Sequence, residues 1–167
     1  NATYGAMAFK YRIEFFLSSA ATEPAHIEEG EAFIYPSEIK YRTFINLPLS
    51  PSGSVRHTAT VSDVEWTLST SLSVPKTQVR EVKLTTDSAG RAVITGVLRN
   101  NSAFPITNST VHGYVINTAT GDPIAASRTL VQDVAPSEER FFQILVPLPQ
   151  SADSATLRAN VSVEAKR

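Results

Sequence analysis

The stretch FKYRIEFFL, residues 9–17, alternates apolar and polar side chains almost without interruption. Alternate side chains of an extended strand point to opposite faces of a sheet, so one side of this segment is apolar and the other is mostly charged. The apolar side carries Phe9, Tyr11, Ile13, Phe15 and Leu17. The pattern predicts a half-buried β-strand.

Strand-like segments recur along the rest of the chain, and prolines and glycines separate them. After a polar loop at residues 18–30, a short apolar run at 32–35 precedes a strand at 39–47. Further strands are expected at residues 55–62, 64–68, 79–86, 92–100, 109–117, 124–130, 140–148 and 155–164. No segment keeps the 3.6-residue period of a helix. The chain is therefore predicted to be all-β, with the antiparallel arrangement of an immunoglobulin-like β-sandwich.

One turn has a specific signal. Residues 87–90, Asp-Ser-Ala-Gly, lie between two strand-like segments, and Gly90 can adopt the positive φ that a hairpin loop needs. We expect residues 79–86 and 92–100 to pair through this turn.

Two segments of the chain resemble each other at an offset of one hundred residues. Pro36-Ser37-Glu38 recurs as Pro136-Ser137-Glu138, and Ala59-Thr60-Val61-Ser62 is matched by Ala159-Asn160-Val161-Ser162. Residues 40–45 and 140–145 share aromatic and aliphatic positions. A common offset indicates a duplicated module. We therefore expect two tandem modules, residues 1–75 and 76–167, joined by a linker around residues 73–77.

The offset predicts that the first module is incomplete, because the equivalents of the strands at residues 79–100 would precede residue 1. Three explanations remain open. The chain was cut inside the first module, residues 64–72 supply a replacement strand, or the two halves share one sheet. We favour the second, since a module that lacks two strands would expose a core face and an open edge.

The second half resembles the FxLYD type of bacterial envelope domain over about residues 80–146. The resemblance lies in Gly96-Val97-Leu98-Arg99-Asn100-Asn101-Ser102, the strand 111–117, the turn at Gly121, and the loop 133–138 before an aromatic strand. Residues 113–117, Gly-Tyr-Val-Ile-Asn, replace the name-giving motif. The resemblance implies an extracytoplasmic immunoglobulin-like module with no catalytic residues to carry over, and makes the first half a more diverged copy.

Composition restricts the partners. Fifteen basic and sixteen acidic residues are interspersed, so no basic stripe favours nucleic acid. Cysteine is absent, which excludes disulfides and thiolate chemistry. No stretch approaches the roughly 20 apolar residues that span a bilayer. We expect membrane attachment only through an anchor outside this chain.

Catalytic signals are weak. His26, His57 and His112 have no metal-ligand spacing, and no Gly-x-Ser-x-Gly elbow is present. The glutamates at 23, 28, 29 and 31 lack the alternating spacing of a calcium loop, and a solvated loop explains them better. We expect no enzyme, no cofactor and no metal site.

Aromatic residues supply the candidate binding surface. Phe16, Phe44 and Phe142 lie on the phase opposite to the main apolar set of their strands. They suit a partner surface, or they fill an interface between modules. The candidate residues are Phe16, Phe44, Tyr35, Tyr41 and Trp66.

We expect a non-catalytic pair of immunoglobulin-like domains that acts as a binding, spacer or assembly module of the bacterial cell envelope. Its partner would be a protein or the cell wall. The alternative is a carbohydrate-binding module beside an enzyme, which needs coplanar exposed aromatic rings. A third hypothesis, a small hydrolase, needs a histidine within hydrogen-bond reach of a serine or carboxylate in a pocket.

Overall fold

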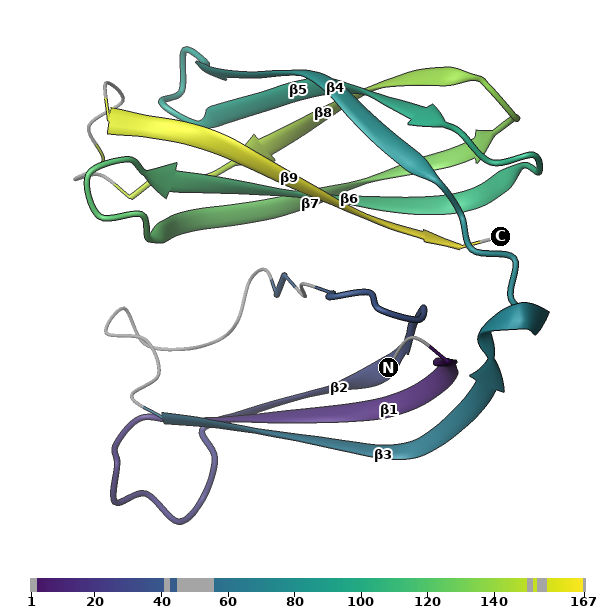
Figure 1. The fold of residues 1–167 in the computed structure, drawn as a ribbon. Coiled ribbons are helices and arrows are strands. Elements are labelled where there is room, and N and C mark those ends of the chain that lie inside the picture. Colours follow the sequence, from purple (N-terminus) through teal and green to yellow (C-terminus); the bar gives the residue numbers. More distant parts are fainter. Residues whose placement is uncertain (1–2, 41–42, 45–55, 150–151, 153–155, 167) are drawn as a thin grey trace. The chain divides into compact units, whose positions relative to one another are not determined.

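The computed structural model of the protein describes residues 3–40, 43–44, 56–149, 152 and 156–166. Throughout these ranges the long elements are β-strands, and every strand pairing is antiparallel (Figure 1). A short 3-10 turn spans Ser69–Ser71. The predicted all-β fold is confirmed. Across the same ranges, no helix has the length and apolar character that crossing a bilayer requires.

The chain divides into two compact units. The described part of unit 1 comprises residues 3–40 and 56–72. Unit 2 comprises the described residues from Ser73 onward, together with Thr43 and Phe44.

Unit 1 contains a three-stranded sheet, sheet I, with the order β2-β1-β3. Its strands are β1 (Tyr4–Phe16), β2 (His26–Ile34) and β3 (Arg56–Leu68). Two predicted strands at 55–62 and 64–68 are thus one element. The register slips by one residue where Asp63 has a φ of 51°, so a β-bulge interrupts the strand without ending it.

The predicted loop at 18–30 is wrong in its second half, where β2 begins at His26. Residues 28–31, Glu-Glu-Gly-Glu, have low intrinsic strand propensity. Pairing with β1 overrides it. Glu29 lies directly opposite Arg12 and forms an ion pair with it, and opposite charges at such positions stabilise a sheet.

Most of the predicted strand at 39–47 lies outside the described residues. The described residues Ile39, Lys40, Thr43 and Phe44 are not in a strand.

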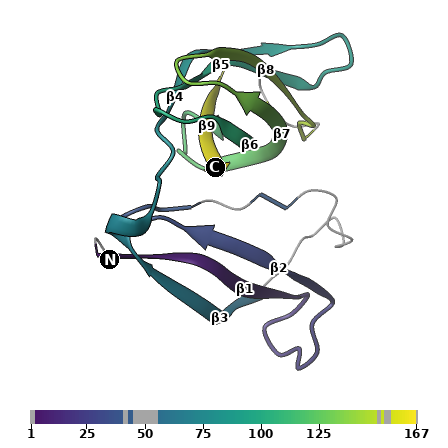
Figure 2. The same ribbon diagram turned by 90° about the vertical axis from the view of Figure 1, so that its right-hand side faces the viewer.

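Unit 2 contains two three-stranded sheets that face each other (Figure 2). Sheet II has the order β4-β5-β8, and sheet III has the order β7-β6-β9. The strands are β4 (Thr77–Thr86), β5 (Ala92–Asn100), β6 (Ile106–Asn117), β7 (Pro123–Val134), β8 (Glu139–Val146) and β9 (Leu157–Lys166). The predicted hairpin is confirmed: β4 pairs with β5, and Gly90 has a φ of 75°.

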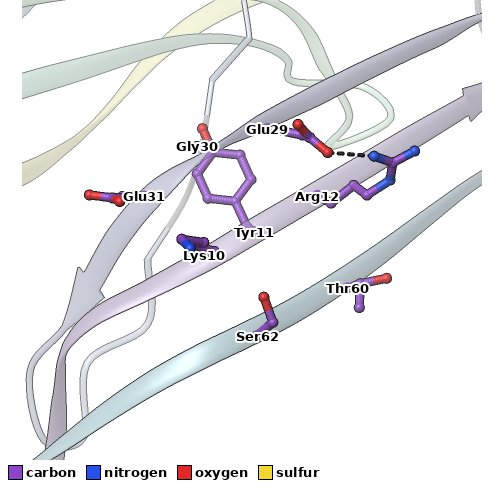
Figure 3. Close-up of a pocket in the computed structure, with 8 residues that line it drawn as sticks. All are labelled: Lys10, Tyr11, Arg12, Glu29, Gly30, Glu31, Thr60 and Ser62. Atoms are coloured by element: carbon purple, nitrogen blue, oxygen red, sulfur yellow. Dashed lines mark hydrogen bonds and ion pairs between the residues drawn. The ribbon is translucent and has the colours of Figure 1, made fainter.

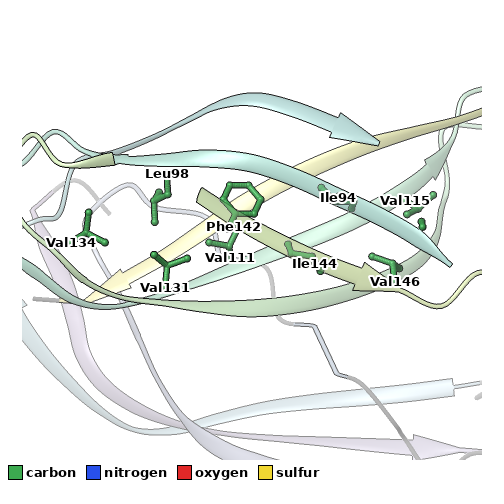
Figure 4. Packing of buried hydrophobic residues seen from close by; sticks show 10 residues of the cluster. Ile94, Leu98, Val111, Val115, Val131, Val134, Phe142, Ile144 and Val146 are labelled. Carbon is green, nitrogen blue, oxygen red and sulfur yellow. The ribbon is translucent and has the colours of Figure 1, made fainter. Parts of the chain in front are cut away.

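The core of unit 2 lies between sheets II and III (Figure 4). Its buried members are Ala92, Ile94 and Leu98 of β5, Val111 and Val115 of β6, Val131 and Val134 of β7, and Phe142, Ile144 and Val146 of β8. Phe142 is therefore a core residue, and its predicted outward orientation is wrong; the exposed neighbour is Phe141. Gly96 makes the room, since a Cβ there would lie 2.6 Å from the Phe142 ring.

The repeated Pro-Ser-Glu segments form the same turn in both units. Ser37 and Ser137 have positive φ angles of 60° and 64°. A proline followed by a residue with positive φ is the pattern of a type II turn. The Glu38 carboxylate accepts the Tyr35 N–H at 2.8 Å, and the Glu138 carboxylate accepts the Ala135 N–H at 2.7 Å. Each turn directly follows a strand, β2 or β7.

The sheets attached to these turns also correspond. In each, the strand before the turn is one edge, the preceding strand is central, and a later strand is the other edge, giving β2-β1-β3 and β7-β6-β9. The pairs Ala6–Ile34 and Ile106–Val134 even share the offset of one hundred. Sheet I thus matches sheet III. The described residues of unit 1 contain no counterpart of sheet II.

Candidate functional site

One side of sheet I gathers apolar side chains from all three strands. Residues directly opposite each other in antiparallel strands point to the same side, and the register pairs Tyr11 with Val61 and Ala6 with Trp66. We call this side the apolar face. It comprises Tyr4, Ala6, Phe9, Tyr11, Ile13 and Phe15 of β1, Ala32 and Ile34 of β2, and Ala59, Val61, Val64, Trp66 and Leu68 of β3.

Much of the apolar face is open to solvent. The exposed fraction is 62% for Trp66, 57% for Val61, 48% for Leu68 and 42% for Tyr4. Single exposed apolar residues are common on protein surfaces, but a contiguous group from adjacent strands is typical of a surface that a partner covers.

The corresponding side of sheet III is buried against sheet II. Val161 of β9 lies opposite Gly113 of β6, as Val61 lies opposite Tyr11. A Cβ on Gly113 would lie 2.9 Å from the Cδ1 atoms of both Ile94 and Ile144. The missing side chain therefore lets sheet II approach sheet III closely.

In sheet I the residue opposite Val61 is Tyr11, and its side chain covers its own sheet. Its ring lies over Gly30 of β2, where an added Cβ would be 2.5 Å from the Tyr11 hydroxyl. Phe15 lies beside His26, with ring centroids 6.1 Å apart. The apolar face thus has an aromatic ring opposite Val61, where sheet III has Gly113 opposite Val161.

The opposite side of sheet I, the polar face, holds a shallow depression of about 460 Å³ (Figure 3). Its lining comprises the polar-face residues Lys10, Arg12, Glu29, Glu31, Thr60 and Ser62, and it is also bordered by Tyr11 and Gly30, which belong to the apolar side. Arg12 forms ion pairs with Glu14 and Glu29, and the Lys10 Nζ lies 2.9 Å from the Asp63 carboxylate. The Thr58 hydroxyl donates to Glu14 at 3.1 Å.

These pairs hold the polar face in its charged form. The hydrogen bond from Arg12, followed by that from Thr58, lowers the pKa of Glu14 below its ordinary 4.5. The hydrogen bond to Asp63 raises the pKa of Lys10 above its ordinary 10.5. A ligand would have to displace these ion pairs, so the polar face is better explained as a solvated surface.

A polar cluster lies on the outer side of sheet III. The His112 Nδ1 is 3.1 Å from the Thr43 hydroxyl, and its Nε2 is 3.8 Å from a carboxylate oxygen of Glu164. A hydroxyl, an imidazole and a carboxylate in this order resemble a nucleophile, a base and an acid.

Access and distance argue against catalysis by this cluster. Thr43 and His112 are 5% and 1% exposed, which leaves no path for a substrate to the hydroxyl. The 3.8 Å separation also exceeds a hydrogen bond. The contact attaches Thr43 to sheet III, and in the described part of the chain no group of three histidine or carboxylate side chains is placed to hold a metal ion.

The predicted site residues differ in their burial and in their surroundings. Phe16 is 4% exposed, with the Arg56 guanidinium 3.7 Å above its ring. Tyr35 is buried beside Phe33, with ring centroids 5.3 Å apart. Phe44 is half-buried in unit 2, and Tyr41 lies outside the described residues. Trp66 is the exposed member of the set.

No protein-family model, curated protein or solved structure matches this chain. Its role is therefore inferred from its own geometry, and the likeness of residues 80–146 to the FxLYD type stays a prediction.

The candidate surface around Trp66 includes residues that sequence reasoning assigned to a core. Tyr11 and Ile13 lie on the apolar side of the strand predicted to be half-buried, because they alternate with polar residues. Alternation shows that two sides of a strand differ; it does not show that a second layer covers the apolar one. The signal that could have found the surface is the offset itself, because it left the first copy without two strands.

Proposed function

We propose that this chain is a non-catalytic binding and assembly module of the bacterial cell envelope, built from two diverged copies of an immunoglobulin-like domain. The shared turn, the shared strand order and the common offset of sheets I and III support the duplication. The resemblance of residues 80–146 supports the extracytoplasmic placement.

The strand pairing in unit 2 supports the immunoglobulin-like assignment. Immunoglobulin domains place strands A, B and E side by side in one sheet and strands C′, C and F side by side in the other. With β4, β5 and β8 as A, B and E, and β7, β6 and β9 as C′, C and F, sheets II and III have this order.

The observation that carries the proposed function is the apolar face of sheet I. Its counterpart in unit 2 is covered by sheet II, whereas Trp66, Val61 and Leu68 remain about half or more exposed. An apolar sheet surface of this kind gains free energy when a partner covers it, at about 25 cal/mol per Å² of apolar area. Such a surface suits binding better than chemistry.

Sedimentation with cell fractions tests this function. The protein is incubated with isolated bacterial envelopes, with protein-stripped peptidoglycan sacculi, and with a cytosolic membrane-free extract immobilised on beads. We expect retention on envelopes and not on the cytosolic beads, and the sacculi distinguish a cell-wall partner from a protein partner. Equal retention on all three, or on none, contradicts the proposal.

A matched pair of variants locates the binding surface. Val61→Lys places a charge on the apolar face, whereas Phe141→Lys changes an aromatic residue of β8 that is 67% exposed. Binding should fall with Val61→Lys and persist with Phe141→Lys. The reverse result would assign binding to unit 2.

Carbohydrate binding is the second candidate, and one observation favours it. Tyr4 pairs with Leu68, and Ala6 pairs with Trp66, so the exposed Tyr4 and Trp66 are diagonal neighbours on the apolar face. Sugars stack on exposed aromatic rings. Saturable change of Trp66 fluorescence on titration with soluble cell-wall polysaccharide would support this reading, and no change with any polysaccharide would exclude it.

A further inference from the structure

We propose that the apolar face of sheet I is a homodimerisation surface, on which two copies of this chain pack their sheets I face to face. This inference deepens the proposed assembly function and rests on it. It names the partner as a second copy of the chain and the contact as sheet against sheet.

Unit 2 shows what kind of structure covers a sheet of this topology. Sheet III is covered by three antiparallel strands whose inner side is apolar, including Ile94, Phe142 and Ile144. Sheet I of a second copy also offers three antiparallel strands with one apolar side. Two copies together would supply two three-stranded sheets, as sheets II and III do in unit 2.

The aromatic side chains that project from the apolar face argue against a partner shaped like sheet II. Sheet II approaches sheet III over Gly113, which lies opposite Val161, whereas the bulky Tyr11 lies opposite Val61 in sheet I. The exposed rings of Tyr4 and Trp66 also project from this face. Aromatic residues are enriched where separate protein chains meet, so the face has the composition of an interface between molecules.

The size of the face sets the expected affinity. Strands of 13, 9 and 13 residues form sheet I. At about 3.3 Å per residue and about 4.8 Å between strands, the face measures about 550 Å². Two such faces bury about 1,100 Å², which is near the lower limit for a specific interface. We therefore expect a reversible dimer with a dissociation constant in the micromolar range.

A two-fold arrangement would also close the assembly. In a two-fold dimer, each copy uses the same surface, so no apolar face is left to recruit a third copy. The polar end of the face, at His26, Glu28 and His57, would remain at the rim.

The chain carries its own reporter for this contact, because Trp66 is its single tryptophan and lies on the apolar face. Sedimentation velocity of the intact chain, from about one to a few hundred micromolar, should show a monomer–dimer equilibrium. Over the same range, Trp66 emission should move to longer wavelength on dilution, as the indole becomes exposed to water.

Three variants accompany the wild-type chain. Val61→Lys keeps the tryptophan and should weaken association at least about tenfold, since a buried unpaired charge is costly; its emission should no longer depend on concentration. Trp66→Lys should give the same loss by sedimentation. Phe141→Lys, the exposed aromatic control on β8, should dimerise like the wild type. Circular dichroism confirms that each variant is folded.

Each other outcome overturns the inference. A monomer at every concentration with water-exposed tryptophan emission means that the face does not pair with itself. A monomer with emission typical of a buried indole means that another part of the chain covers the face. A dimer that Phe141→Lys disrupts and Val61→Lys does not would place the interface in unit 2.

The two proposals fail separately. A monomer that still sediments with envelopes through Val61 keeps the proposed function and removes the dimer. A dimer that binds no envelope fraction keeps the assembly surface and removes the envelope partner.

Discussion

Sheets I and III have the same strand order and follow the same kind of turn, yet one is half of a packed core and the other has an open apolar face. In sheet III, the buried core residues Val111, Val115, Val131 and Val134 pack against sheet II, and Gly113 lets sheet II approach closely. In sheet I, Tyr11 lies over Gly30 and shields part of its own backbone.

The difference shows that local pairing and layer packing are separable in this chain. Cross-strand contacts and the Pro-Ser-Glu turn suffice to specify a sheet and its register. The second layer is a further requirement, and residues such as Gly113 are adapted to it. Sheet I keeps the pairing and lacks that adaptation.

The largest expected effect comes from exchanging the residues that lie opposite Val161 and Val61 in the two sheets. Gly113→Tyr places a ring where a Cβ alone would already lie 2.9 Å from Ile94 and Ile144. We expect unit 2 to lose about 3 kcal/mol or more of stability, the upper range for overpacking a core. Urea unfolding followed by circular dichroism measures the loss.

The reciprocal change, Tyr11→Gly, is the control for this prediction. It uncovers Gly30 and removes a half-buried ring from unit 1, so we expect a loss of about 1 to 2 kcal/mol, followed through Trp66 fluorescence. If Gly113→Tyr leaves unit 2 as stable as the wild type, sheets II and III are not in close contact, and the contrast with sheet I disappears.

The matched turns give a smaller effect of about the same size in both units. Glu38→Ala and Glu138→Ala each remove a carboxylate that accepts a backbone N–H three residues earlier, at a cost of about 1 kcal/mol. A further hydrogen bond holds the turn in unit 2, because the Asn100 carbonyl accepts the Ser137 N–H at 2.9 Å. Glu38→Ala should therefore raise the hydrogen-exchange rate of the Tyr35 amide more than Glu138→Ala raises that of the Ala135 amide. An equal or smaller gain at Tyr35 would mean that unit 1 holds its turn as firmly as unit 2.

The smallest expected effect is a difference in acid sensitivity. Glu14 in unit 1 has its pKa lowered by Arg12, and Asp87 in unit 2 has its pKa lowered by the backbone and then the side chain of Arg91. A carboxyl group with a lowered folded-state pKa stabilises the fold above its unfolded pKa and loses that contribution as the pH falls through the folded value.

The ordinary values of 4.5 and 3.8 place the onset at higher pH for Glu14 than for Asp87. As the pH is lowered, the melting temperature of unit 1 should therefore begin to fall before that of unit 2. Glu14→Gln should flatten its profile alone, and Asp87→Asn that of unit 2 alone. A flattened profile in the wrong unit would show that these ion pairs are not local to their sheets.

Sequence patterns predicted the strands that alternate and the turns that contain glycine or proline. Phe9, Tyr11, Ile13 and Phe15 share the predicted side, and Gly90 closes the predicted hairpin. Both features are local, because alternation depends on one strand and a positive φ on one residue.

The features that the sequence did not decide depend on how neighbouring strands pair. Residues 28–31 resemble a loop until Arg12 is known to lie opposite Glu29. Phe141 and Phe142 both stand in an alternating segment, and the choice between them depends on Gly96 in the neighbouring strand. Of the candidate residues, Phe16 is covered by Arg56 of the neighbouring strand, which the pattern of a single strand does not reveal.

The bulge at Asp63 has a consequence for the solubility of the chain. β3 is a 13-residue strand at the edge of sheet I, and a long straight edge next to an apolar surface is a template for cross-β aggregation. The extra residue breaks the regular spacing of backbone donors and acceptors, and the Lys10–Asp63 ion pair puts charge at the same point. Both features lie at the strand edge and not on the apolar face, and both oppose edge-to-edge pairing of β3 with another strand.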